Sequence, residues 1–102
     1  MRFKRSAAVA LAAWAVAGCV DRVPEGASGR EIYLEVCARC HAPDLSGGIG
    51  PAIGPGSVSA GHPPEFLESV IVEGRGRMPS FAQTLSDAQI ATVVDYIRRE
   101  QE

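Results

Sequence analysis

The sequence predicts a small all-α domain of three to four short helices around a loop rich in glycine and proline. Two stretches, 28–31 and 86–89, have the pattern of a capping box, in which a serine and a later Glu or Gln satisfy each other's backbone amides. Apolar residues at helical spacing follow each box, and a third such stretch ends at Gly74. No window alternates between apolar and polar residues as a half-buried strand does. A chain of 102 residues has room for one such domain.

The N-terminal segment has the features of an export signal. Arg2, Lys4 and Arg5 precede an uncharged run over 6–18. This run of about a dozen residues is shorter than the roughly 20 that a transmembrane helix needs, and it has the size of a signal-peptide core. It ends Val-Ala-Gly directly before Cys19, which resembles the bacterial lipobox.

We therefore expect residues 1–18 to be a lipoprotein signal peptide that is removed. Residues 19–27 would then form a lipidated Cys19 and a short tether, and residues 28–102 the folded domain. This arrangement predicts an exported protein, anchored through lipid on the periplasmic side of a bacterial membrane. The alternative is an ordinary signal peptide in which Cys19 has no role.

The charge of the remaining chain excludes one class of partner. The formal charge is −2 for the whole sequence and −5 without residues 1–18, and the remaining part has no lysine. An acidic domain of this kind is not expected to bind nucleic acid, because phosphate binding requires clustered Lys and Arg. Domains of this size often depend on a disulfide, a metal or a cofactor for stability.

The predicted helices flank a long central loop. The first helix covers about residues 29–39, with apolar positions Ile32, Tyr33 and Val36. The next begins at Pro63 or Pro64 and ends at Gly74, with apolar positions Phe66, Leu67, Val70 and Ile71. The last runs to about Arg99, with apolar positions Ile90, Val93, Val94 and Ile97.

The central loop, residues 42–62, carries six glycines and three prolines. A loop of some twenty residues without structure is unusual inside a compact domain unless something organises it. Three short helices do not offset the entropy of ordering such a loop. The sequence therefore indicates that a large apolar group belongs in the core.

A cofactor-attachment motif supplies that group. The segment 37–41 reads Cys-Ala-Arg-Cys-His, and C-x-x-C-H is the signature of covalently attached haem c. Cys37 and Cys40 lie one helical turn apart, as bonding to the two vinyl groups of one porphyrin requires, and His41 follows in position to coordinate iron. A zinc site lacks a second pair of ligands. A thioredoxin-like redox pair lacks the preceding strand, and a disulfide between the two cysteines would close a cramped ring.

The second axial ligand is predicted to be Met78. Apart from the initiator it is the only methionine, and it lies between glycines and Pro79 rather than in a helix. Pro79 favours an extended conformation at Met78, which suits a side chain that points inward from a loop. A thioether is a soft, neutral ligand that raises the reduction potential. The alternatives are His62, which lies before two prolines in a turn, and a five-coordinate iron.

From about residue 29 to 97 the chain resembles a small class I cytochrome c. In that family the first and last helices cross, and a glycine and an aromatic residue of the first pack against an aromatic residue of the last. Gly29 and Tyr33 match the first helix, and Tyr96 matches the last. The resemblance implies the cytochrome c fold, wrapped around one covalently bound haem c.

Further motifs carry the same resemblance. Gly50-Pro51 matches a Gly-Pro pair whose proline carbonyl accepts a hydrogen bond from the haem histidine, which fixes its tautomer. The Met78-Pro79 pair and the sequence over 85–90 are also typical of the family. The absence of lysine after residue 18 is a departure, because mitochondrial-type members present a ring of lysines to their partners.

The resemblance implies a one-electron carrier of a respiratory chain rather than an enzyme, with no small-molecule substrate. Its expected partners are redox proteins: a terminal oxidase, a quinol:cytochrome c reductase or a periplasmic dehydrogenase. One alternative is a gas- or peroxide-binding sensor or enzyme on the same fold, and another is an integral haem subunit of an oxidase or quinoprotein dehydrogenase. Arg39, Arg75 and Arg77 lie near the site in sequence, either as a basic collar or as solvated side chains.

Overall fold

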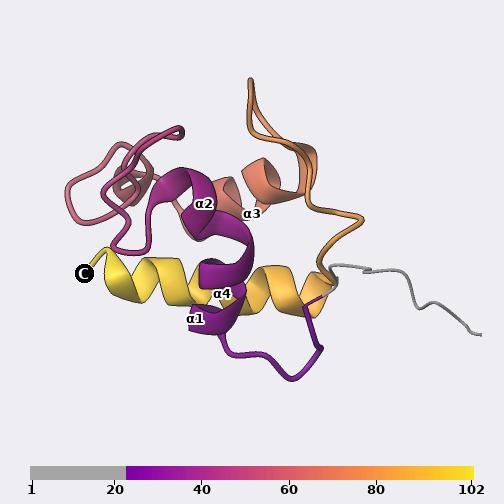
Figure 1. The fold of residues 1–102 in the computed structure, drawn as a ribbon. Helices are drawn as coiled ribbons and strands as arrows, with labels where there is room; N and C mark the ends of the chain where they lie inside the picture. The colour runs from indigo at the N-terminus through magenta and orange to yellow at the C-terminus, as the bar shows by residue number, and fades with distance from the viewer. Residues whose placement is uncertain (1–22) are drawn as a thin grey trace, which may run out of the picture.

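The computed structural model describes residues 23–102, so the predicted signal peptide and Cys19 lie outside the described part (Figure 1). The elements in chain order are α1 (Gly29–Ile32), the π-helical η1 (Tyr33–Cys37), α2 (Ala38–His41), the 3₁₀ turn η2 (Ser59–Gly61), α3 (Pro64–Glu73) and α4 (Asp87–Glu100). Figure 1 shows α1 crossing α4, and the 42–62 loop near the C-terminal end of α4. The all-α prediction is confirmed.

The first predicted helix is one continuous helical segment from α1 to α2. Its capping box is present, since Ser28 Oγ accepts from the Glu31 amide and Glu31 bonds back to the Ser28 amide. Within it, η1 is a π-helical turn, in which the Ala38 amide donates to the Tyr33 carbonyl five residues earlier. The segment ends at His41 rather than near residue 39, because Ala42 has a positive φ of 67°.

The crossing of α1 and α4 depends on close approach at Gly29. A Cβ atom added to Gly29 would lie 2.6 Å from the Tyr96 Cβ and 2.7 Å from the Thr92 carbonyl oxygen. The Tyr33 and Tyr96 rings lie side by side, with centroids 5.6 Å apart. Gly29, Tyr33 and Tyr96 therefore pack as the resemblance implied.

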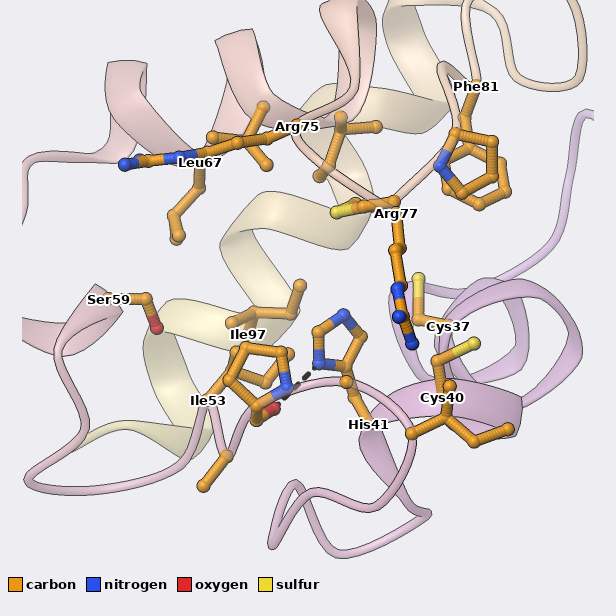
Figure 2. A pocket seen from close by; sticks show the side chains of 18 of the residues that line it. Cys37, Cys40, His41, Ile53, Ser59, Leu67, Arg75, Arg77, Phe81 and Ile97 are labelled. Carbon is orange, nitrogen blue, oxygen red and sulfur yellow. Dashed lines mark hydrogen bonds between the residues drawn. The ribbon is translucent and has the colours of Figure 1, made fainter.

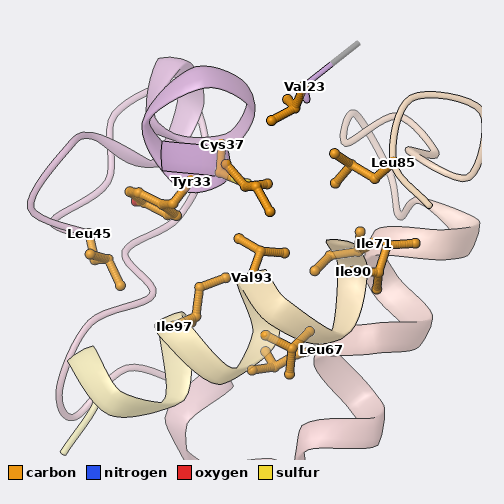
Figure 3. Packing of buried hydrophobic residues seen from close by; sticks show 12 residues of the cluster. Val23, Tyr33, Cys37, Leu45, Leu67, Ile71, Leu85, Ile90, Val93 and Ile97 are labelled. Carbon is orange, nitrogen blue, oxygen red and sulfur yellow. The ribbon is translucent and has the colours of Figure 1, made fainter. Parts of the chain in front are cut away.

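The two other helices agree with the sequence prediction. Pro63 is the N-cap of α3 and Pro64 its first residue, while Gly74 ends it with a φ of 75°. The capping box of α4 joins Ser86 and Gln89. The apolar faces of both helices meet the first segment in one core (Figure 3), whose members include Ile32, Tyr33, Cys37, Leu67, Ile71, Leu85, Ile90, Val93 and Ile97.

The 42–62 loop is held by the last turn of α4. Arg98 Nη1 donates to the carbonyls of Ala60 and His62 at 3.2 and 3.0 Å. Gln101 Nε2 donates to the Ile53 carbonyl at 2.9 Å and to Ser59 Oγ at 3.0 Å. Three of these four bonds end on backbone carbonyls of the loop, and such bonds need no periodic pattern of side chains.

Val23 and Ala27 pack against the domain, although the sequence predicted a tether up to residue 27. Val23 is 8% exposed and belongs to the core. Gln89 Nε2 donates to the carbonyls of Val23 and Pro24 at 2.8 and 3.2 Å. The folded part thus includes Val23, and any tether ends before it. No helix in the described range has the length and apolar character needed to cross a membrane.

Candidate haem site

An apolar cavity of about 530 Å³ lies between the C-x-x-C-H segment, the 49–59 loop, α3 and the loop around Met78 (Figure 2). Its volume is within the range of about 300–1,000 Å³ typical of small-molecule and cofactor sites. The structure brings all five predicted site residues of the domain to its wall, namely Cys37, Cys40, His41, Pro51 and Met78. Cys19 lies outside the described residues.

His41 is oriented by the carbonyl of Pro51. Its Nδ1 lies 2.8 Å from the Pro51 carbonyl oxygen, which can only accept, so the proton is on Nδ1. The Nε2 atom then carries a lone pair, and in Figure 2 this side of the ring faces the cavity. Only 9% of His41 is exposed. The imidazole is therefore prepared to coordinate a metal through Nε2.

Backbone hydrogen bonds hold the Pro51 carbonyl in place. The Gly50 amide donates to the Cys40 carbonyl at 2.8 Å, and the Gly47 amide to the His41 carbonyl at 2.9 Å. A Cβ at Gly50 would lie 3.0 Å from His41 Cε1 and 3.2 Å from His41 Nδ1. Glycine at position 50 thus leaves the space that the imidazole occupies.

Cys37 and Cys40 are free thiols on the helical segment beside His41. Cys37 is buried and Cys40 partly buried, and both line the cavity. Burial, with a smaller contribution from Cys40, raises the pKa of the Cys37 thiol to about 12. Near neutral pH the folded chain therefore keeps the Cys37 thiol protonated, facing an apolar space.

Met78 reaches the cavity from a tight loop. The Arg75 and Met78 backbones form an isolated antiparallel bridge, with N–O distances of 3.0 and 2.9 Å. Gly74 and Gly76 permit the turn, since both have positive φ. The Phe81 amide donates to the Ile71 carbonyl at 2.9 Å, which fixes the loop against α3.

Tyr33 makes a contact that no local pattern predicts. Its hydroxyl donates to the Ala42 carbonyl at 2.6 Å, one residue after His41. The side chain is fully buried, and burial raises the pKa of Tyr33 above its usual range, so the phenol stays neutral and can donate. Tyr33 therefore ties the end of the C-x-x-C-H segment to the core.

The donor atoms at the cavity fit an iron porphyrin better than they fit a metal ion held by protein side chains alone. Two thiols, an imidazole nitrogen and a thioether meet at a largely apolar cavity, which suits a large apolar ring and soft or borderline ligands. Residues 23–102 contain no group of three or more His, Cys, Asp or Glu side chains arranged to hold a metal ion. His62 does not line the cavity, and its ring stacks on Phe66 at 4.0 Å.

The chain is similar to known c-type cytochromes. Cytochrome c55X of Pseudomonas aeruginosa is 35% identical over 83 residues, which cover 76% of this chain and 69% of that protein. The cytochrome c subunit of the menaquinol:cytochrome c reductase of Bacillus subtilis is 32% identical over 76 residues, or 74% of this chain. The chain spans only 29% of the length of that subunit.

A solved structure and a protein-family match lead to the same class of protein as these two relatives. The solved structure of the c-type cytochrome NirC has 34% sequence identity and a TM-score of 0.60, and the match covers 70% of this chain and 85% of that one. Residues 24–97 match the family described as cytochrome c oxidase, cbb3-type, subunit III. The protein therefore belongs to this family, as a class I cytochrome c domain with the cytochrome c fold and a role in electron transfer.

Proposed function

We propose that the protein is a one-electron carrier with a single haem c, bonded to Cys37 and Cys40 and ligated by His41 and Met78. The observation that carries the proposal is the hydrogen bond between His41 Nδ1 and the Pro51 carbonyl. It directs Nε2 to the cavity that both thiols and the methionine also line. The bound haem supplies a one-electron Fe(III)/Fe(II) couple.

Each residue has a separate task in this proposal. Cys37 and Cys40 keep the cofactor attached outside the cell. His41 is made more basic by its bond to Pro51, which strengthens it as a ligand. Met78 would supply the second iron ligand of the chain, and its thioether would raise the potential and keep small molecules off the metal.

The wall of the cavity includes two exposed aliphatic side chains, where a redox partner could come close to the haem. Ile49 and Val58 are large aliphatic residues with exposed fractions of 82% and 84%, and both line the cavity. A haem held in this cavity would have these two side chains at its border with solvent. An apolar rim of this kind permits close approach of a redox partner at that border.

The expected partners are membrane-associated or periplasmic redox proteins of a respiratory chain. The similar Bacillus subtilis protein is named as the cytochrome c subunit of a menaquinol:cytochrome c reductase. A quinol:cytochrome c reductase, a terminal oxidase or a periplasmic dehydrogenase would serve as partner. In this proposal the protein exchanges electrons and turns over no small-molecule substrate.

We also propose that Cys19 carries a lipid anchor after removal of residues 1–18. Since Val23 already packs in the core, only residues 20–22 separate it from Cys19. The distance from Cys19 to Val23 is then roughly 14 Å at most, when the chain between them is fully extended. A Cys19→Ser variant is expected to leave the membrane fraction while its haem spectrum is unchanged. Retention of this variant in the membrane would overturn the anchor and leave the electron-transfer proposal intact.

The electron-transfer proposal is tested by the spectrum of the reduced, matured protein and by its response to carbon monoxide. A low-spin six-coordinate haem c spectrum that carbon monoxide leaves unchanged is expected. Rapid binding of carbon monoxide would instead favour a gas- or peroxide-binding site and contradict the carrier.

A further inference from the structure

The polar side chains of the cavity are few, and none of them is acidic. Apart from the cysteines and His41, the charged or hydroxyl side chains on its wall are Ser59, Arg75 and Arg77. A haem brings two propionate carboxylates, and these need hydrogen-bond donors or cations because burial of an unpaired charge is costly. The inference below rests on the proposed function and concerns which of these residues receive the carboxylates.

Arg75 lies at the end of the cavity that is formed by α3 and η2. Its guanidinium carbon is 5.6 Å from the centroid of the Phe66 ring, and the imidazole of His62 also stacks on that ring. His62 directly follows η2 and is bonded through its carbonyl to Arg98. All side-chain hydrogen bonds from arginine within residues 23–102 come from Arg98, so the Arg75 donors are available.

Ser59 is a donor at the same end. Its Oγ accepts from Gln101 Nε2 at 3.0 Å and lies 3.2 Å from Ser57 Oγ. The Ser57 Oγ in turn accepts from the Ala60 amide at 3.3 Å. When Ser57 donates to Ser59, the Ser59 proton has no acceptor in the protein and is free for a carboxylate in the cavity.

Arg77 occupies a different position. In Figure 2 its side chain extends from the Met78 loop toward Cys37 and Cys40, whereas Ser59 and the end of Arg75 lie on the opposite side of the cavity. The vinyl groups and the propionates belong to opposite halves of the porphyrin. Bonds to Cys37 and Cys40 would hold the vinyl half on the side of Arg77, and the propionates would then lie on the side of Ser59 and Arg75.

We propose that Ser59 and Arg75 form the propionate-binding site of this protein, and that Arg77 does not take part. Arg75 neutralises a carboxylate at the mouth of the cavity, and Ser59 donates a hydrogen bond to it. The other ionisable groups that contacts place at this end are His62, stacked on Phe66, and Arg98 on α4. No Asp or Glu belongs to the cavity wall.

The test compares Arg75→Gln with Arg77→Gln in the matured holoprotein. Both variants remove one positive charge from the cavity wall, so they are matched in net charge. His62→Asn is included in the reference protein and in both variants, so that the imidazole stacked on Phe66 is absent from every protein compared. The readout is the reduction potential as a function of pH, measured between about pH 5 and pH 8.

A cation beside a carboxylate lowers its pKa, so a propionate paired with Arg75 stays ionised across this range. Without Arg75 its pKa rises by about one unit, and a proton is bound more tightly in the reduced state. In the reference the pH-dependent fall of the potential should therefore lie below the measured range, and in Arg75→Gln it should move upward by about one pH unit. Arg77→Gln should keep the pH profile of the reference, and Arg75→Lys should restore it. Ser59→Ala should shift the profile in the same direction as Arg75→Gln.

Two results would overturn the assignment. One is an equal shift of the pH profile in both arginine variants or in neither, and the other is a shift confined to Arg77→Gln. In either case an unaltered low-spin spectrum would leave the proposed function standing. A protein without bound haem, or with a five-coordinate iron, would instead reject the proposed function itself.

Discussion

Gly29 of α1 contacts Tyr96 of α4 so closely that the crossing of the two helices has no room for a side chain at position 29. A Cβ there would meet the Tyr96 Cβ at 2.6 Å and the Thr92 carbonyl oxygen at 2.7 Å. Because one of these neighbours is backbone, a side-chain rotation does not relieve the clash. The crossing supports the helical segment that ends in the C-x-x-C-H motif, so its geometry bears on the haem site.

Gly29→Ala should therefore lower the free energy of unfolding by about 1–3 kcal/mol, the usual cost of overpacking. Gly26→Ala is the matched control, because a Cβ at Gly26 has nothing within 4 Å. The control should change stability by less than about 0.5 kcal/mol. Denaturant unfolding of both variants measures the difference in the free energy of unfolding. Equal values for Gly29→Ala and Gly26→Ala would show that α1 and α4 can move apart at little cost in stability.

Gly50→Ala should raise the reduction potential. The new Cβ would lie 3.2 Å from His41 Nδ1 and displace the ring from the Pro51 carbonyl. Loss of that hydrogen bond makes the imidazole less basic and stabilises Fe(III) less. A bond worth about 1 kcal/mol corresponds to roughly 40 mV for one electron.

Gly48→Ala is the control for this substitution, since its Cβ would meet only the Cys40 carbonyl oxygen, at an ordinary 3.5 Å. Redox titration of both proteins makes the comparison. A potential that is unchanged in Gly50→Ala, or shifted equally in Gly48→Ala, would mean that the Pro51 bond does not tune the iron.

Met78→Ala should leave the haem attached, lower the reduction potential and open the iron to carbon monoxide. The thioether is the ligand that favours reduced iron, and its removal frees one axial position. Val70→Ala also shortens a side chain on the cavity wall but removes no ligand, so its reduced protein should still refuse carbon monoxide. Carbon monoxide binding followed by absorbance distinguishes the two, and a six-coordinate spectrum in Met78→Ala would show that another residue ligates the iron.

Arg98→Gln should loosen the loop beside the haem site. Arg98 donates to the carbonyls of Ala60 and His62, and loss of these bonds should cost about 1–3 kcal/mol. Arg99→Gln is the control, because Arg99 is exposed and donates no side-chain hydrogen bond within residues 23–102. Hydrogen exchange of the 53–62 amides should accelerate in the first variant alone. Equal exchange in both would assign the order of the loop to other contacts.

Much of the fold was readable from local patterns. Ser28 with Glu31 marked the start of α1, and Ser86 with Gln89 marked the start of α4. Both could be predicted because capping depends on neighbours in sequence. Gly74 marked the end of α3 for the same reason. The contact of Gly29 with Tyr96 was predicted only through resemblance, since no local rule joins residues so far apart.

The features that escaped prediction depend on tertiary structure. The π-helical turn at Tyr33–Cys37 adds a residue to one turn without any marker in the sequence. No local pattern pairs Arg98 or Gln101 with the 42–62 loop, yet both donate hydrogen bonds to its carbonyls. Residues 23–27 were expected to form part of a tether because Pro24 and Gly26 occur there, but Gln89 and the core hold Val23.

The central claim is that one haem is covalently bonded to Cys37 and Cys40. The most direct measurement is the mass of the protein matured in a host that attaches haem c, followed by the mass of the peptide that contains both cysteines. We expect one added haem on that peptide in the native sequence and none in the Cys37→Ala/Cys40→Ala variant. A fully matured native protein whose peptide carries two free thiols and no haem would contradict it.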